Sequence, residues 1–208
     1  MTLMAERPVI SGTEPSGSFG ELLDLLDELH VPDGYRAEII RGSIVVSPWS
    51  KGYYLRVMRS VCGQLGPYLP GGHVIERAPF LFVFPGIERA YGPDIHAAPE
   101  KVYETGSNRL DGEGLSFVAE LTSTSTREED LTDKVEVYAE AGIPVYLVLD
   151  MQKEQAIVYS SPSAVGGYEV RFSKPFGEKI YIPDPFGYAL DTSGFQAPDE
   201  NAVEPDKA

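Results

Sequence analysis

The chain has a single cysteine, Cys62, among its 208 residues, so it cannot form an internal disulfide. The surrounding segment VMRSVCGQL has helical spacing, which predicts that Cys62 is a small buried apolar residue.

No apolar run approaches the ~20 residues that a membrane-spanning helix needs. The first residues also lack the basic stretch and apolar segment of a secretory signal. We therefore expect a cytoplasmic protein with no membrane partner.

Several catalytic signatures are missing as well. The sequence has no P-loop, no dinucleotide-binding glycine pattern and no G-x-S-x-G nucleophile motif. Its three histidines, His30, His73 and His96, do not have the spacing of metal ligands, which argues against a zinc site. His96 follows Asp94 by two residues and shares its face of a strand, so it could approach that acid.

Basic residues are few, with 17 Lys and Arg against 32 Asp and Glu, which gives a net charge of -15. This charge argues against loose nucleic-acid binding, which depends on neutralising phosphates. It leaves room for a local basic rim around an acidic, metal-binding pocket. We expect residues 1–17 to be flexible and 196–208 to be a disordered acidic tail. Between them, residues 18–195 are expected to form one domain.

Helical and strand patterns alternate along this domain. Apolar residues at helical spacing predict helices at Phe19–Leu29, with Ser18 as N-cap, Tyr53–Leu69 and Arg127–Ala141. Apolar or alternating runs predict strands at Ala37–Ile40, Ser43–Ser47, His73–Arg77, Phe80–Phe84, Tyr91–Ala97, Leu115–Leu121, Val145–Leu149, Ala156–Ser160, Tyr168–Phe172 and Glu178–Ile182. Of these, Phe80–Phe84 is expected to be central because it is almost wholly apolar. The interleaving predicts a mixed α/β sheet with helices packed on its faces.

Two carboxylates stand on neighbouring apolar segments. Asp94 lies behind Gly92 and Pro93 on a short predicted strand, and Glu120 follows the apolar run Leu115–Ala119. Magnesium prefers oxygen ligands and usually takes only one or two carboxylates. If the two strands lie side by side, Asp94 and Glu120 can share one Mg²⁺ or Mn²⁺ ion.

A lysine accompanies this pair on the helix predicted over Arg127–Ala141. The expected core-facing stripe of this helix consists of Leu131, Val135, Tyr138 and Gly142. Lys134 projects from the same side, at the border of the stripe. An ammonium there costs free energy unless it is paired or reaches solvent, and pairing with Asp94 and Glu120 would satisfy it. Such a lysine could hold an attacking water or stabilise a phosphate in the transition state.

Each of these features also has a plain structural explanation. Strand-end acids are more often solvated or capping groups than functional ones. Taken alone, Lys134 is more typical of an edge residue whose ammonium reaches solvent. Thr126 with Glu129 three residues later has the pattern of a capping box, and Arg127 near the helix start is expected to be solvated.

Four segments resemble the Uma-two family of the PD-(D/E)xK nuclease superfamily. They are EIIRGSIVVSP at Glu38–Pro48, GPDI at Gly92–Ile95, VAELTSTSTREEDLTDKVEVYAEAGIPVYLVLD at Val118–Asp150, and FGEKIYIP near the end. The resemblance spans roughly residues 20 to 195. It implies a restriction-endonuclease-like α/β fold, with a mixed central sheet flanked by helices and extended by hairpins.

The resemblance also implies roles for particular residues. Asp94 and Glu120 would bind Mg²⁺, and Glu38, the acid of the first strand, would hold metal-bound water. The superfamily's usual lysine position, two residues after Glu120, is occupied by Thr122. In the Uma-two group that lysine lies on the following helix, which here corresponds to Lys134.

A second departure follows Pro48. Many relatives carry a histidine at the start of the next helix, whereas this chain has KGYY, which places Tyr53 or Tyr54 there. The role of that position stays open. Family habit and exposed strand edges also suggest a homodimer.

The sequence leaves three functions in competition. The leading one is a Mg-dependent endonuclease that hydrolyses phosphodiester bonds in nucleic acid, DNA foremost, with metal-activated water. The alternative, which the acidic charge favours, is an inactive nuclease-fold protein that serves as a partner-binding module. The third is metal-dependent hydrolysis of a smaller phosphoester, which would turn over mononucleotides but not polymers.

Overall fold

The computed structural model describes residues 18–48, 51–163 and 166–197. The segment expected to be flexible, 1–17, and residues 198–208 of the expected disordered tail 196–208 lie outside the described residues. The helices are α1 Phe19–Glu28, α2 Tyr54–Leu65, α3 Arg127–Leu131 and α4 Asp133–Glu140, with 3-10 turns η1 Gly66–Tyr68, η2 Glu100–Val102 and η3 Gly112–Gly114. The strands are β1 Tyr35–Ile40, β2 Ser43–Pro48, β3 His73–Glu76, β4 Leu81–Phe84, β5 Arg89–Tyr91, β6 Ile95–Pro99, β7 Arg109–Asp111, β8 Phe117–Leu121, β9 Val145–Asp150, β10 Gln155–Pro162, β11 Tyr168–Pro175, β12 Lys179–Ile182 and β13 Tyr188–Asp191.

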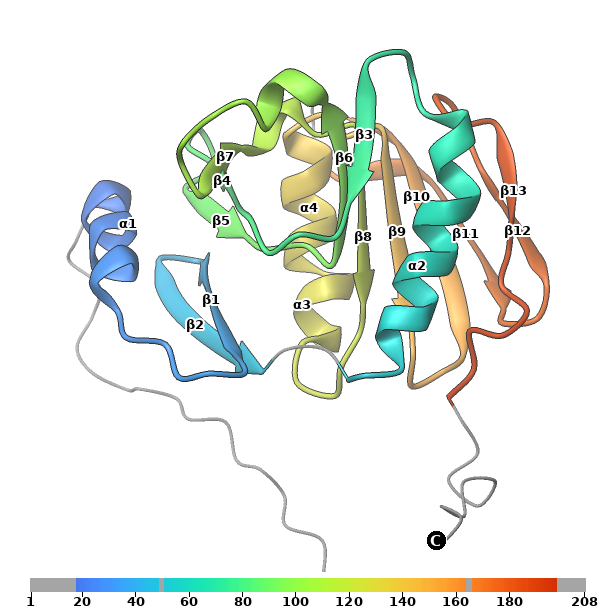
Figure 1. Ribbon diagram of the computed structural model, residues 1–208, viewed down its shortest axis with the longest axis horizontal. Helices are drawn as coiled ribbons and strands as arrows, with labels where there is room; N and C mark the ends of the chain where they lie inside the picture. Colours follow the sequence, from blue (N-terminus) through green and yellow to red (C-terminus); the bar gives the residue numbers. More distant parts are fainter. Residues whose placement is uncertain (1–17, 49–50, 164–165, 198–208) are drawn as a thin grey trace, which may run out of the picture.

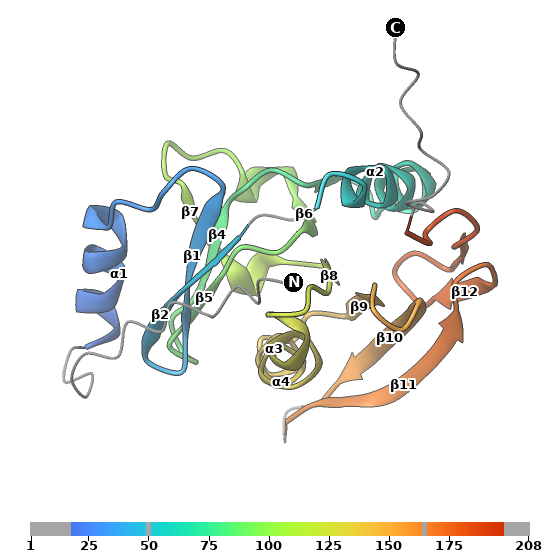
Figure 2. The same ribbon diagram turned by 90° about the horizontal axis from the view of Figure 1, so that it is seen from below.

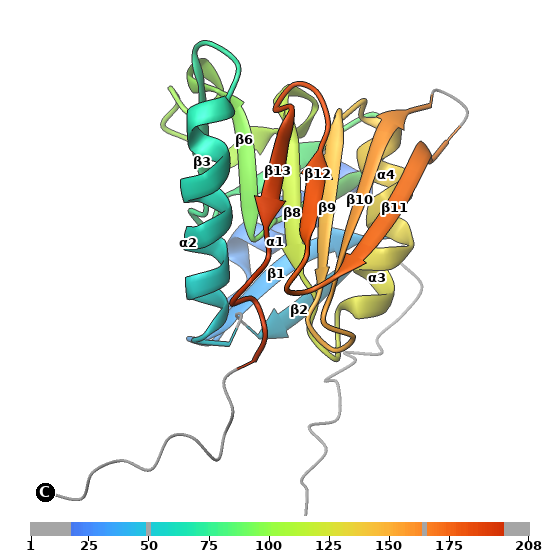
Figure 3. The ribbon, with the colours of Figure 1, turned by 90° about the vertical axis from the view of Figure 1, so that its right-hand side faces the viewer.

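A six-stranded sheet in the order β11-β10-β9-β8-β6-β3 forms the centre of the molecule. The β8–β9 pair is parallel and the other pairs are antiparallel. Every residue of β8 and β9 is buried, as expected for strands covered on both faces. Helix α2 and the β12–β13 hairpin cover one face, and α3 and α4 lie on the other (Figures 1, 2 and 3).

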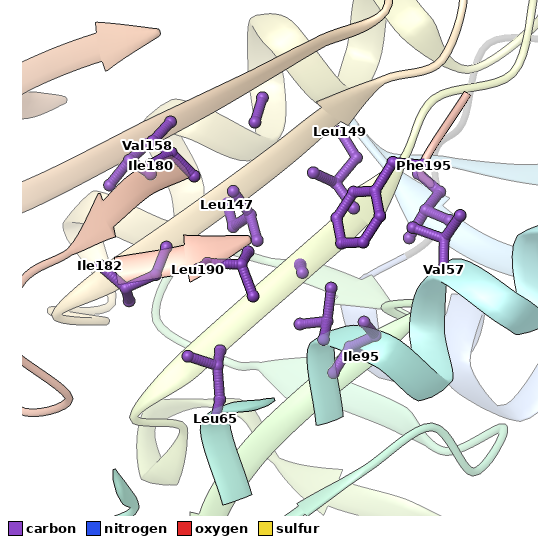
Figure 4. Close-up of a cluster of buried hydrophobic side chains, with 14 of the residues drawn as sticks. Val57, Leu65, Ile95, Leu147, Leu149, Val158, Ile180, Ile182, Leu190 and Phe195 are labelled. Carbon is purple, nitrogen blue, oxygen red and sulfur yellow. The ribbon is translucent and has the colours of Figure 1, made fainter. Parts of the chain in front are cut away.

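The core under α2 is aliphatic. Val57 and Leu65 of α2 pack with Leu147 and Leu149 of the sheet and with Ile180 of the terminal hairpin (Figure 4). Alternate residues of a strand point to opposite faces, so the odd-numbered positions of β8 and β9 supply this core.

The opposite face is rich in aromatic residues. Val118 and Tyr146 of the central strands pack here with Tyr138 of α4 and with Phe82 and Tyr91 of a second sheet. Glu120 is an even-numbered position of β8, like Val118, and therefore points toward α4 rather than toward α2. The strand pattern thus fixes which helix can meet this carboxylate.

The second sheet has the order β2-β1-β5-β4-β7 and packs beside the α4 face. Its β1–β2 hairpin turns at Arg41 and Gly42, which both have positive φ, as a two-residue hairpin turn requires. Strand β4 lies between β5 and β7, which confirms the expectation that Phe80–Phe84 is an internal strand, although it belongs to this second sheet and not to the six-stranded one. In the described part of the chain, no helix combines the length and apolarity needed to cross a bilayer.

The helix predicted over Arg127–Ala141 is interrupted. Thr132 separates α3 from α4 with φ -130° and ψ -83°, outside the helical region. Its hydroxyl donates to the carbonyl oxygen of Glu128 at 2.7 Å, and such back-bonding by threonine bends helices. The predicted stripe is only partly right: Tyr138 is buried, but Gly142 is exposed.

The capping box expected at Thr126 is also wrong. Thr126 makes no side-chain capping bond, and its hydroxyl instead donates to Oδ2 of Asp130 at 2.9 Å. In contrast, the predicted N-cap at Ser18 is present, with a reciprocal bond to Glu21.

Three other expectations need correction. The strand predicted over Tyr91–Ala97 is divided between β5 and β6 by Gly92 and Pro93, because proline lacks the N–H that a ladder needs. Asp94 therefore lies in the bend before β6. The terminal strand β13 was not predicted. Leu55, an apolar residue within the helix predicted over Tyr53–Leu69, is 40% exposed rather than buried.

Candidate active site

Lys134 occupies the centre of a buried cluster of charged side chains. Its Nζ lies 2.8 Å from Oε1 of Glu120, 2.9 Å from Oδ1 of Asp130 and 3.9 Å from Oε1 of Glu38. The expectation that Lys134 lies at the border of the helix stripe is wrong, since only 1% of it is exposed. The break at Thr132 is the reason, because it changes which residues of α4 face the sheet.

Glu38 and Asp94 approach the same place from different elements. Glu38 lies on β1, and its Oε1 accepts a hydrogen bond from the N–H of Gly92 at 2.9 Å. Oδ2 of Asp94 accepts one from the N–H of Leu121, the residue after Glu120, at 2.8 Å. The structure therefore brings together all four residues named from the sequence, Glu38, Asp94, Glu120 and Lys134.

Arg36 belongs to this cluster and was missed in the sequence. Its Nη1 donates to Oδ1 of Asp94 at 3.2 Å and to the carbonyl oxygen of Gly92 at 2.7 Å. Its Nε lies 3.8 Å from Oε2 of Glu38. The only sequence signal was its position two residues before Glu38 on one strand, which puts both side chains on the same face.

Asp130 was missed as well, although a signal existed. Asp130 and Lys134 are four residues apart, the spacing at which side chains of opposite charge pair on a helix. Asp130 is 1% exposed and is the buried residue of α3. We call the complete set the charged cluster: Arg36, Glu38, Asp94, Glu120, Asp130 and Lys134.

The charged cluster contains four carboxyl groups and two cations, so its ionised form carries two excess negative charges. Burial raises the pKa of Glu120 to about 8, although Lys134 acts in the opposite direction. Burial alone would lower the pKa of Lys134, but Asp130, Glu120 and Glu38 raise it well above its usual value. Lys134 is therefore a permanent cation, and the cluster readily retains a proton on a carboxyl group.

The donor set fits a hard divalent cation. Oxygen ligands and two excess negative charges match Mg²⁺ or Mn²⁺, which would replace the retained proton. Oδ1 of Asp130 is already engaged by the ammonium of Lys134, at 2.9 Å. Among the described residues, no group of three His, Cys, Asp or Glu side chains is arranged to hold an ion. The fit therefore rests on donor chemistry and charge, and Asp94 and Glu120 are the residues that would hold the ion.

Several other residues considered in the sequence lie away from the cluster. Nδ1 of His96 lies 2.9 Å from the hydroxyl of Tyr103, and its Nε2 lies 3.0 Å from the carbonyl oxygen of Ala78. Both ring nitrogens are thus engaged elsewhere. Burial lowers the pKa of His96 to about 4.

The residues near the ends of β8 and β9 have structural contacts. The hydroxyl of Tyr54 donates to the carbonyl oxygen of Thr122 at 2.8 Å, and the Thr122 hydroxyl donates to Gln152 at 2.6 Å. Arg127, expected to be solvated, instead makes a two-pronged ion pair with the buried Asp150, at 2.7 and 3.1 Å. Tyr54 and Thr122 thereby join α2 to the sheet.

The charged cluster opens toward a pocket at Asp94. A cavity of about 480 Å³ is bounded by β1, α2 and the β3–β4 connection, and Arg36 and Asp94 form part of its wall. Asp94 is 8% exposed, whereas Glu120 and Lys134 are each 1% exposed. A ligand in this cavity would therefore meet the cluster at Asp94 and Arg36.

Comparison with known proteins gives the family and the fold. The model of the Uma2 family, described as "Putative restriction endonuclease", matches residues 20–193. A solved structure from Anabaena variabilis, titled as a "putative nuclease belonging to DUF820", is 14% identical and has a TM-score of 0.64. The match covers 82% of this chain and 94% of that one.

No curated protein matches the chain. The structural match confirms the fold class expected from the sequence, a restriction-endonuclease-like α/β fold. Because the family model covers most of the sequence, the chain belongs to the Uma2 family.

Proposed function

We propose that this protein is a nuclease that hydrolyses phosphodiester bonds in nucleic acid and depends on Mg²⁺ or Mn²⁺. The observation that carries the proposal is the meeting of Asp94, Glu120 and Lys134 in one cluster beside a pocket. These side chains come from a bend, a strand and a helix, so their convergence requires the whole fold. Membership of a nuclease family supports the same conclusion.

The chain's own residues account for charge and position at the reacting phosphate. Lys134 stays protonated, so it cannot act as a base; it supplies a fixed positive charge for the charge that develops on phosphate oxygen. Arg36, at the wall of the pocket, supplies a second cation beside Asp94. Asp130 and Glu38 hold Lys134 in place through ion pairs.

Asp94 and Glu120 are proposed as the ligands of the divalent ion. When bound, the ion would polarise the phosphate and lower the pKa of water. Glu38, fixed by the N–H of Gly92, is proposed to orient the attacking water.

The test is cleavage of labelled single-stranded and double-stranded oligonucleotides by the purified protein in Mg²⁺, Mn²⁺ or EDTA. We expect cleavage only with metal, and a loss of about a hundredfold or more in Asp94→Asn and Glu120→Gln. The matched control is Glu140→Gln, which removes an exposed carboxylate from α4 and should cleave like the wild type.

Circular dichroism would establish that each variant is folded. Cleavage by a folded Asp94→Asn/Glu120→Gln double variant at the wild-type rate would rule the proposal out. Absence of any metal-stimulated cleavage by the wild type would instead favour a partner-binding module. Turnover of mononucleotides without cleavage of polymers would favour a smaller phosphoester as substrate.

A further inference from the structure

The pocket beside the charged cluster has a mixed chemical character. Arg36 and Arg77 contribute two cations, and Met58 and Phe80 contribute apolar and aromatic surface. Asp94 is the acid that the pocket shares with the charged cluster. Cations beside an aromatic ring are the combination with which proteins bind a phosphate and an unstacked base.

The two arginines lie at different depths in the pocket. Arg36 is largely buried, with 12% of its side chain exposed, and its Nη1 is held 3.2 Å from Asp94. Arg77 is exposed, beyond the end of β3. A phosphate close to Arg36 would thus lie next to the cluster, and Arg77 would meet a phosphate or sugar nearer to solvent.

Phe80 provides the surface for a base. It is half-buried, and its ring packs at 5.9 Å from both His96 and Tyr103. These neighbours hold the ring in the wall of the pocket. The ring can therefore stack with a base without the loss of conformational freedom that an unrestrained aromatic side chain would undergo.

The size of the pocket sets a limit on what can enter. A volume of about 480 Å³ falls in the range of pockets that take one small-molecule-sized unit. A base inside a duplex stays stacked between its neighbours and would have to leave the helix to enter. A second cavity, of about 310 Å³, shares Phe80 but has Glu76 and Glu100 in its wall, so it is unsuited to a phosphate.

We propose that the pocket lined by Arg36, Arg77 and Phe80 binds one unpaired nucleotide next to the phosphodiester bond that is cut. The nucleic-acid substrate is accordingly single-stranded, or carries an unpaired nucleotide at the site. This inference rests on the proposed nuclease function for the identity of the ligand, but binding can be measured without cleavage.

The experiment uses Glu120→Gln in EDTA, so that bound oligonucleotide stays intact, and follows fluorescence anisotropy. The probes are a fluorescein-labelled single-stranded DNA dodecamer, its blunt duplex, and the same duplex with one bulged nucleotide. We expect the single strand and the bulged duplex to bind about tenfold or more tightly than the blunt duplex.

Added to Glu120→Gln, Arg77→Ala and Phe80→Leu should each weaken binding of the single strand about tenfold. Arg77 is exposed, so its substitution should leave folding intact, and leucine keeps an apolar side chain at position 80. The matched control is Arg171→Ala on β11, which removes the same charge far from the pocket and should change affinity less than twofold.

Two results would overturn the inference: a blunt duplex that binds as tightly as the single strand, or equal losses in Arg77→Ala and Arg171→Ala. Neither result depends on catalysis. If the wild type cleaves DNA while the pocket variants bind normally, the inference fails and the nuclease function stands. If the probes bind as expected and no metal supports cleavage, the nuclease function fails and the pocket assignment stands.

Discussion

Lys134 keeps a full positive charge inside the protein because three carboxyl groups surround its ammonium. The same ammonium lies 5.5 Å from the centre of the Tyr91 ring, which adds a favourable cation–π contact. Removing one partner of such a buried set leaves uncompensated charge behind, so the cluster is as important for folding as for chemistry.

Lys134→Met should therefore destabilise the fold by about 3 to 5 kcal/mol at neutral pH, measured by urea unfolding. The loss should shrink at acidic pH, where the stranded carboxyl groups take up protons. Lys174→Met is the control, because that lysine is half exposed in a surface pair with Glu178 and should change stability by less than about 1 kcal/mol. Equal effects of the two substitutions would contradict the account.

The stability of the fold also depends on pH through His96, which disfavours the folded state when it takes up a proton. Because its pKa is lowered to about 4 in the fold, protonation favours the unfolded chain, where an ordinary histidine has a pKa near 6.5. Its contribution to stability is complete above pH 6.5 and is lost as the pH falls toward 4, on the order of 3 kcal/mol.

The measurement compares the wild type with His96→Asn by urea unfolding between pH 7 and pH 4. The wild type should lose its advantage over the variant across this window, whereas a constant difference would show that His96 does not titrate in the fold. Measuring in EDTA removes any contribution from bound metal.

At the scale of elements, the short helix α4 is fastened to the second sheet through Asp133. Its Oδ1 accepts from Nε of Arg41 at 2.7 Å, its Oδ2 accepts from Nε of Arg89 at 3.3 Å, and the hydroxyl of Tyr91 also donates to it. Asp133 directly precedes Lys134, so this attachment positions the ammonium although it does not touch it.

Asp133→Asn should lower stability by about 2 to 3 kcal/mol, because charge-assisted bonds to two arginines become neutral ones. It should also reduce cleavage through displacement of Lys134. Glu140→Gln, on the exposed side of the same helix, is the control and should change neither quantity. A variant that unfolds more easily but cleaves at the wild-type rate would limit Asp133 to a purely structural role.

Patterns that act within a few residues explain the elements that the sequence predicted well. The Ser18 cap, the turn at Arg41 and Gly42 and the buried strand β9 all follow from local chemistry. The break at Thr132 could not be predicted, because threonine is compatible with a helix. Whether its hydroxyl bond to a backbone carbonyl disturbs the helix depends on the surrounding structure. Strand β13 was not predicted, because its pairing with β12 depends on packing beyond its own four residues.

The residues of the candidate site also divide into those that the sequence could predict and those that it could not. Glu38, Asp94, Glu120 and Lys134 could be named from residue type, order and family resemblance. Arg36 could not, because its bond to Asp94 joins residues 58 positions apart across two sheets. The spacing of apolar residues could not predict the burial of Lys134 either. This burial depends on the interruption of the helix and on the position of β1 over the ammonium.

The molecule as a whole is strongly acidic, with a net charge of -15, yet its candidate site presents two arginines to the pocket. Long contact with a nucleic-acid backbone would need a basic surface, which this composition does not favour. Recognition is expected to be confined to the few phosphates that Arg36 and Arg77 can reach.

This expectation sets the salt dependence of binding. With two phosphates neutralised, the logarithm of the affinity for single-stranded DNA should fall with the logarithm of salt concentration with a slope of roughly -1.4. Anisotropy titrations of Glu120→Gln between low and physiological salt would give the slope. A value steeper than about -4 would mean a wide basic surface and would contradict this account.

Whether Asp94 and Glu120 hold a divalent ion beside Lys134 can be decided with a crystal soaked in Mn²⁺. Anomalous scattering would locate the ion independently of activity. We expect a manganese peak coordinated by the carboxylates of Asp94 and Glu120, and its disappearance in Glu120→Gln. An empty cluster at a Mn²⁺ concentration that supports cleavage, or a peak bound only elsewhere on the protein, would contradict it.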